Sequence, residues 1–168
     1  MKKVMYLFAT LLIGGLILSG CNKNPEPTPT PDPEPTPTTT KVAYKVINTS
    51  VDPNTGELKT ISPCIKLDMT YIDANGELVT ETNVTLPWTK VVEVTPPFHA
   101  KMEGTFSYNE EELPDPVYFG KRNGIGVYTG DSYNGELNGS INKYTREKFL
   151  EIMTQSPDKL HFSKEQDF

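Results

Sequence analysis

The stretch Phe98-His99-Ala100-Lys101-Met102-Glu103-Gly104-Thr105-Phe106-Ser107-Tyr108 alternates apolar or small residues with polar ones along its whole length. Successive side chains of a β-strand point to opposite faces, so the stretch predicts a strand with one buried and one solvated face. Residues 42–46 and 65–71 have the same period of two. This pattern is typical of antiparallel strands that pack one face on a core, and we therefore expect antiparallel sheets.

Further strands are expected at residues 78–82, at 83–95 with an interruption at Pro87, at 117–121 and at 125–129. Turn signals separate them: Asn75-Gly76 predicts a type I′ hairpin, residues 52–56 a looser turn, and Asn123-Gly124 another hairpin. Many short strands with such turns favour an all-β, two-sheet antiparallel β-sandwich over alternating strands and helices.

One short C-terminal helix is predicted within residues 144–153. Thr145 is suited to cap its N-terminus, Phe149, Leu150 and Met153 form an apolar stripe, and Ser156-Pro157 stops it. A helix of about ten residues is marginal without tertiary support, so we expect the stripe to pack against the sandwich.

The N-terminal residues carry a targeting signal. Two lysines precede an apolar run over residues 4–18, and the run closes on Leu18-Ser19-Gly20-Cys21. A small-small-Cys sequence in this position is typical of bacterial lipoproteins, so residues 1–20 are interpreted as a signal peptide and Cys21 as the lipidation site. The alternative is an uncleaved transmembrane anchor in which Cys21 has no role.

Residues 21–40 form a linker between the predicted anchor and the domain. Proline occupies every second position from Pro25 to Pro37, between Glu, Thr and Asp. Proline fixes φ and removes backbone donors, so this Pro/Thr-rich disordered segment is expected to act as an extended stalk rather than as a ligand for proline-recognising domains. The β-sandwich domain is then assigned to residues 41–168.

Composition excludes some partners. The chain has 16 basic and 22 acidic residues and a formal charge of −6, and loss of residues 1–20 removes Lys2 and Lys3. An acidic surface without a basic patch disfavours nucleic acid. If Cys21 carries lipid, Cys64 has no partner within the chain, so we expect it to be a small buried apolar side chain rather than a reactive thiol.

No motif assigns catalytic residues, a cofactor or a metal. His99 and His161 lie at no zinc-ligand spacing and are interpreted as isolated surface histidines, and a G-x-S-x-G elbow is absent from the sequence. Two acidic segments, residues 110–115 and 52–57, offer oxygen ligands for calcium, but neither has a full ligand set. We therefore favour solvated acidic loops and expect no enzyme.

Aromatic residues offer candidate recognition surfaces. Trp88 follows Leu86-Pro87 in an apolar segment, which favours a core anchor over a sugar-stacking platform. Four tyrosines near glycine-containing loops suit glycan or protein recognition, although half-buried strand tyrosines explain them equally well: Tyr118, Tyr128, Tyr133 and Tyr144.

Part of the chain resembles a known family. Thr70-Tyr71-Ile72-Asp73-Ala74-Asn75-Gly76, followed by Val84-Thr85-Leu86-Pro87-Trp88-Thr89-Lys90, is similar to the MmpS family of mycobacterial membrane proteins, and residues 42–46 resemble its opening strand. The resemblance implies an immunoglobulin-like β-sandwich outside the membrane and an accessory role beside RND-type exporters. Members of the MmpS family have a transmembrane helix and paired cysteines. This chain instead has a predicted lipid anchor, the single Cys64 and a tail from Gly124 that does not match the family.

The build as a whole also resembles small surface lipoproteins of Bacteroidetes-type bacteria: a lipidation signal, a stalk and one β-sandwich. We therefore expect a lipoprotein of the bacterial cell envelope, attached to the outer membrane on its periplasmic face or at the cell surface. The expected function is noncatalytic binding of a protein or glycan partner. The alternative is an accessory subunit of an RND-type export system.

Overall fold

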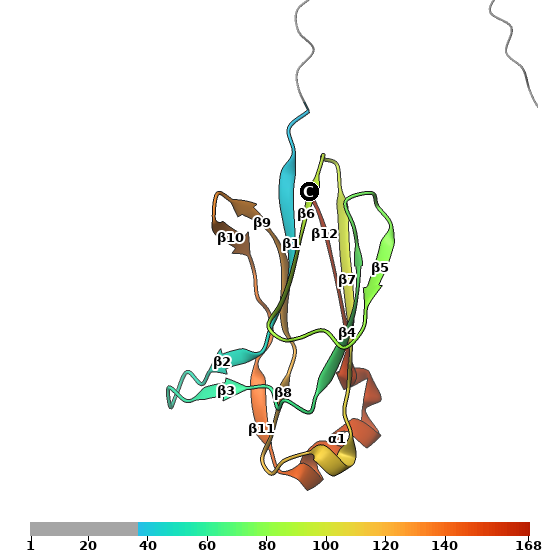
Figure 1. Ribbon diagram of the computed structural model, residues 1–168. Helices are drawn as coiled ribbons and strands as arrows, with labels where there is room; N and C mark the ends of the chain where they lie inside the picture. The colour runs from blue at the N-terminus through green and yellow to red at the C-terminus, as the bar shows by residue number, and fades with distance from the viewer. Residues whose placement is uncertain (1–36) are drawn as a thin grey trace, which may run out of the picture. The chain divides into compact units, whose positions relative to one another are not determined.

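A computed structural model describes residues 37–168 of the chain (Figure 1). The elements follow in the order β1 (Thr40–Ile47), β2 (Thr49–Val51), β3 (Leu58–Thr60), β4 (Lys66–Ile72), β5 (Leu78–Glu81), β6 (Trp88–Val94), β7 (His99–Ser107), η1 (Glu110–Glu112), β8 (Val117–Gly120), β9 (Arg122–Thr129), β10 (Ser132–Gly135), β11 (Ile141–Tyr144), α1 (Arg146–Gln155), η2 (Pro157–Leu160) and β12 (His161–Asp167).

Two four-stranded antiparallel sheets form the body of the domain. One sheet has the order β10-β9-β1-β6 and the other β12-β7-β4-β5, and their inner faces share one hydrophobic core. The alternating stretch of residues 98–108 contains β7: Ala100, Met102 and Phe106 are buried, while the polar side chains between them face outward. The prediction of an all-β sandwich with one short helix is confirmed.

Residues 117–144 form one long bent hairpin. A single register continues from the β9–β10 pairing to the β8–β11 pairing. Its pairs include Ser132 with Thr129, Asn138 with Asn123, and Ile141 with Gly120. The prediction of a hairpin turn at Asn123-Gly124 is therefore wrong, because both residues lie inside β9. The chain reverses instead at residues 130–131, where Gly130 has a φ of 61°.

The hairpin between β4 and β5 is confirmed, but its turn differs from the type expected. Gly76 has a φ of 81°, whereas Asn75 does not have a positive φ, so the turn is not type I′. Asp73 closes the turn instead, because its Oδ1 accepts hydrogen bonds from the amides of Asn75 and Glu77, both at 2.9 Å. The looser turn predicted at residues 52–56 joins β2 to β3 as expected.

The strand expected over residues 83–95 begins at Trp88, after a cis peptide bond between Leu86 and Pro87. Residues 82–87 are irregular and cross from β5 in one sheet to β6 in the other. This crossing segment lies beside the end of β1, as Figure 1 shows, and it forms one wall of the cleft described below.

The C-terminal helix is confirmed at α1, and Thr145 caps it by accepting a hydrogen bond from the amide of Lys148. Phe149 and Met153 of the predicted apolar stripe are buried in the common core, and Leu150 packs against it half-buried. β12 returns along the edge of β7, at residues where the sequence pattern predicts no strand. In residues 37–168, no helix has the length and hydropathy needed to cross a membrane.

Candidate binding cleft

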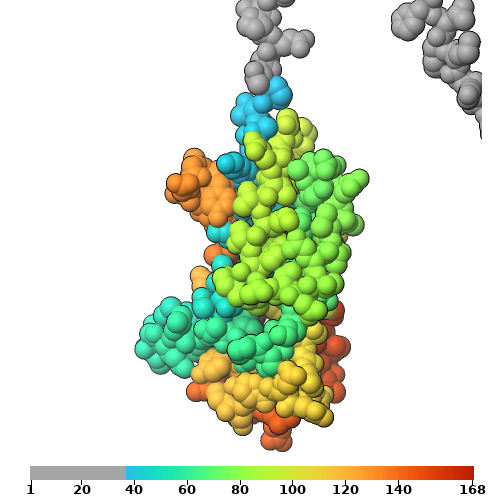
Figure 2. All heavy atoms as spheres, in the orientation of Figure 1, coloured from blue at the N-terminus to red at the C-terminus, as the bar shows by residue number. Residues whose placement is uncertain are grey.

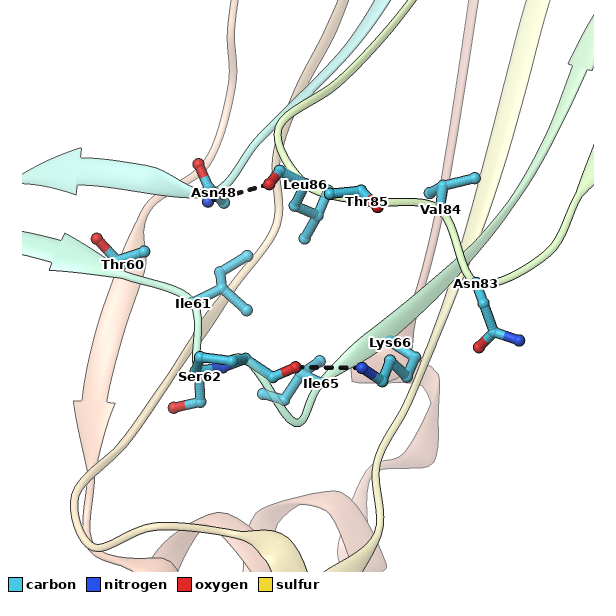
Figure 3. Close-up of a pocket in the computed structure, with 11 residues that line it drawn as sticks. Asn48, Thr60, Ile61, Ser62, Ile65, Lys66, Asn83, Val84, Thr85 and Leu86 are labelled. Atoms are coloured by element: carbon cyan, nitrogen blue, oxygen red, sulfur yellow. Dashed lines mark hydrogen bonds between the residues drawn. The ribbon is translucent and has the colours of Figure 1, made fainter.

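A cleft of about 330 Å³ lies at the end of the sandwich where β1 finishes (Figure 3). One wall is formed by the segment that leaves β3, and the other by the irregular crossing between β5 and β6. Its lining residues are Asn48, Thr60, Ile61, Ser62, Pro63, Ile65, Lys66, Asn83, Val84, Thr85 and Leu86. The volume is at the lower end of the range for small-molecule sites, about 300–1,000 Å³.

Backbone hydrogen bonds fix the wall that follows β3. The amide of Ile61 donates to the carbonyl of Asn48 at 2.8 Å, and the amide of Ser62 donates to the carbonyl of Tyr118 at 2.9 Å. The Ser62 hydroxyl in turn accepts a hydrogen bond from the Tyr118 amide at 2.9 Å. Ser62 is buried, and the bonds from its amide and to its hydroxyl tie this wall to Tyr118 in β8.

The opposite wall is fixed in the same way. The amide of Val84 donates to the carbonyl of Leu67 at 2.8 Å, and the amide of Asn83 donates to Asp68 Oδ1 at 2.7 Å. Asn83 adopts a φ of 51°, a left-handed conformation that asparagine tolerates better than most residues. Asn48 Nδ2 lies 3.4 Å from the carbonyl oxygen of Leu86 and so links the two walls.

The cleft has an apolar interior and a polar rim. Ile61 from one wall and Leu86 from the other point toward each other in Figure 3, and Ile65 lies beneath them. Lys66 is the only charged residue in the lining, and its Nζ makes one long contact, 3.4 Å, with the carbonyl oxygen of Pro63. The arrangement can hold apolar groups in the interior and hydrogen-bonding or anionic groups at the rim.

The two histidines lie elsewhere, on the outer face of the second sheet. The prediction that both are isolated is wrong for His99, whose Nδ1 lies 2.7 Å from Asp167 and whose Nε2 lies 3.8 Å from Glu165. The pairing of β7 with β12 places these side chains together. His161 is hydrogen bonded to the hydroxyl of Thr105 at 3.0 Å. All three members of the His99 cluster are at least half exposed, so water has free access to them.

The acidic segments serve local structure. Asp52 Oδ1 accepts from the amide of Asn54, and its Oδ2 pairs with Lys59 Nζ at 2.7 Å. The hydrogen bond from Lys59 lowers the Asp52 pKa to about 2. Glu110, Glu111 and Glu112 form the 3-10 turn η1. Among residues 37–168, no group of three histidine, cysteine, aspartate or glutamate side chains is arranged to hold a metal ion.

The aromatic candidates do not gather at one surface. Trp88 is buried in the core, as predicted, and its Nε1 donates to Glu81 at 3.0 Å. Tyr128 and Tyr133 pack together on the β9–β10 hairpin, and the ammonium of Lys45 lies 4.4 Å from the Tyr133 ring centroid. The other two tyrosines belong to the β8–β11 ladder: Tyr118 and Tyr144.

Cys64 is partly buried and packs against the core, and burial raises the pKa of its thiol. The predicted lipidation site, Cys21, lies outside the described residues, as do the signal peptide and nearly all of the linker.

The cleft residues were not singled out from the sequence as a binding site. The available signal was the loss of alternation at residues 60–65 and 83–87, each with a proline: Pro63 and Pro87.

In comparisons with known proteins, no family model and no curated protein matches this chain. The resemblances to the MmpS family and to Bacteroidetes-type surface lipoproteins therefore stay predictions.

Proposed function

We propose that this protein is a lipoprotein of the bacterial cell envelope, anchored through Cys21, whose β-sandwich binds a ligand without catalysing a reaction. The observation that carries the binding role is the cleft. It combines an apolar interior with a polar rim and a single cation, and hydrogen bonds hold both of its walls before any ligand arrives. Preformed concave sites of this composition are typical of ligand recognition.

The position of the cleft supports the same role. The chain enters the domain at the start of β1, and Asn48, directly after the end of β1, lines the cleft. A strand of eight residues spans about 26 Å at roughly 3.3 Å per residue, so the cleft lies about that far from the point of entry. That distance separates the cleft from the residue at which the chain enters the domain.

The anchor and the partner are tested separately. The Cys21→Ala variant should lose the mass added by lipid and should leave the detergent phase for the aqueous phase; an unchanged mass and partitioning would refute the anchor. Isolation of the wild-type protein from native membranes then tests the partner. Stoichiometric recovery of an RND-type transporter would instead support the accessory role, and retention of a glycan by the isolated monomer would support a stand-alone receptor.

A further inference from the structure

An exposed apolar pair stands beside the cleft, on the hairpin formed by β2 and β3. Val51 and Leu58 are directly opposed across the two strands, and 61 and 64 % of their surfaces are exposed. Figure 2 shows that this hairpin stands out from the body of the domain. Exposure of two large apolar side chains to water is unfavourable, and contact with a partner that buries them would be stabilising.

The exposed pair lies on the hairpin face that belongs to the cleft. Side chains two positions apart on a strand share a face, so Leu58 lies on the same side as Thr60, which lines the cleft. The opposite face carries the pair Ser50 and Lys59. Ser50 is turned toward the body, where its hydroxyl accepts from the Ile141 amide at 3.2 Å. The apolar pair and Thr60 of the cleft lining therefore share one face of the hairpin.

The charge of the cleft, unlike that of the hairpin loop, is complementary to an acidic group. Lys66 is the only charged residue lining the cleft, in a chain whose formal charge is −6. Its ammonium has only a long contact with one carbonyl, so a carboxylate could approach it without breaking an ion pair. The cleft lining offers no aromatic ring for a sugar to stack on, whereas its aliphatic, hydroxyl and amide groups suit peptide side chains and peptide bonds.

We propose that the face of the β2–β3 hairpin bearing Val51 and Leu58, together with the cleft, binds an extended polypeptide segment of a protein partner. Aliphatic side chains of the segment pack on the exposed pair and enter the cleft, and a carboxylate pairs with Lys66. This proposal deepens the proposed binding function and rests on it.

The hairpin is a poor candidate for insertion into a lipid surface. Its loop carries Asp52 and Glu57, and the chain is acidic, so anionic headgroups would repel it. A neutral lipid surface remains the natural competitor for the apolar pair, and it is included in the test as an outcome.

The test uses the full-length chain and two synthetic peptides. Both are acetylated and amidated hexapeptides in which leucine or valine alternates with serine; one ends in aspartate and its neutral twin ends in asparagine. Binding is followed by amide chemical shifts, which should move at the hairpin and around the cleft. The acidic peptide should bind about three-fold more tightly than its twin, as expected for one exposed ion pair.

Three variants separate the contributions. Lys66→Gln should abolish the preference for the acidic peptide, and Leu58→Ser should weaken both peptides about five-fold through lost apolar contact. Leu78→Ser is the matched control, because Leu78 is 68 % exposed but lies on the edge strand β5, and it should bind like the wild type. None of the three residues is in the core, so the variants should fold.

Equal binding of the two peptides, equal effects of the two leucine substitutions, or shifts confined to Tyr128 and Tyr133 would overturn the proposal. Binding to phosphatidylcholine vesicles that Leu58→Ser abolishes would overturn it in favour of a lipid surface. If both peptides fail while the native isolation still recovers a partner or a glycan, the proposed binding function stands and the peptide surface does not.

Discussion

The Glu81→Gln substitution tests how side chains join the two sheets at the edge formed by β5 and β6. Glu81 on β5 and Lys90 on β6 lie at the edges of different sheets, and their side chains meet at 2.9 Å. The same carboxylate accepts hydrogen bonds from the hydroxyl of Tyr71 and from Trp88 Nε1, each at 3.0 Å. Glutamine has the same shape but only one acceptor oxygen, so at least one donor must then face an NH₂ group.

The expected cost follows from the number and exposure of these bonds. Hydrogen bonds to a charged group contribute about 1.5–3 kcal/mol when buried, but the Glu81 side chain is 33 % exposed, which reduces this value. We expect a loss of about 1–2 kcal/mol in the free energy of unfolding, or roughly 3–8 °C in Tm for a domain of this size.

The loss should depend on pH. The hydrogen bond from Lys90 and then that from Trp88 lower the Glu81 pKa below its ordinary value of 4.5, and the contacts with Tyr71 and Glu81 raise the Lys90 pKa to about 12. A carboxylate whose folded pKa is lowered stabilises the protein fully above its unfolded pKa and loses that contribution as pH falls through the folded pKa. The difference in the free energy of unfolding between wild type and Glu81→Gln should therefore be complete at neutral pH. It should shrink as the pH falls below 4.5, the ordinary pKa of glutamate.

Urea unfolding followed by tryptophan fluorescence measures both effects, since Trp88 is the chain's one tryptophan and is bonded to Glu81. The exposed turn residue Glu77 provides the matched control, Glu77→Gln, which should unfold like the wild type. An unchanged midpoint for Glu81→Gln at neutral pH, or a loss of the same size under acidic conditions, would refute this account of the closed edge.

Three further substitutions test other parts of the fold by the same urea assay. Thr145→Ala removes the helix cap and should cost about 1 kcal/mol, with Thr154→Ala in the same helix as the control. Phe149→Ala should cost about 3–5 kcal/mol, because this fully buried ring joins α1 to the core; a loss below 1 kcal/mol would contradict that role. Gly139→Ala should also destabilise the protein, since Gly139 has a φ of 103° and an added Cβ would strike the Lys121 carbonyl at the bend of the long hairpin.

The strands that the sequence predicted are those with a strong alternating pattern. β4 and β7 pack one face on the core, and burial of that face requires apolar residues at every second position. β12 gave no such signal, because Phe162 is its one apolar residue. Its position comes from pairing with β7, and a strand placed by backbone hydrogen bonds to a neighbour leaves little trace in its own sequence.

The Asn123-Gly124 error shows how long-range register overrides a local turn signal. The dipeptide favours a hairpin in isolation, but β9 is already paired with β1 on one side and β10 on the other. Gly124 is needed there for a different reason, since an added Cβ would meet the carbonyl oxygen of Glu136. The glycine thus permits a close approach of two backbones rather than a reversal of the chain.

The cleft could not be predicted from the sequence, because its residues come from separate segments of the chain. Asn48, Ile61 and Leu86 meet only after β1, β3 and the crossing from β5 to β6 have taken their places. Each of these residues has an ordinary local environment in the sequence. The composition of the cleft, with one lysine and no acid, becomes visible only when the three segments are considered together.

The two ends of the sandwich are built differently, and this asymmetry bears on where a partner can bind. The chain enters at the start of β1, and Phe168 exchanges two backbone hydrogen bonds of 2.9 Å with Phe98, just before β7, so both ends of the described chain lie at one end of the sandwich (Figure 1). The connections there are short turns: residues 73–77, 95–98 and 130–131. The opposite end carries the β2–β3 hairpin, the cleft, η1 and α1. The β2–β3 hairpin and the cleft therefore lie at the end of the domain opposite Thr40, whereas the β9–β10 turn lies beside the start of β1, so a partner bound at the hairpin and the cleft stays clear of the point where the chain enters the domain.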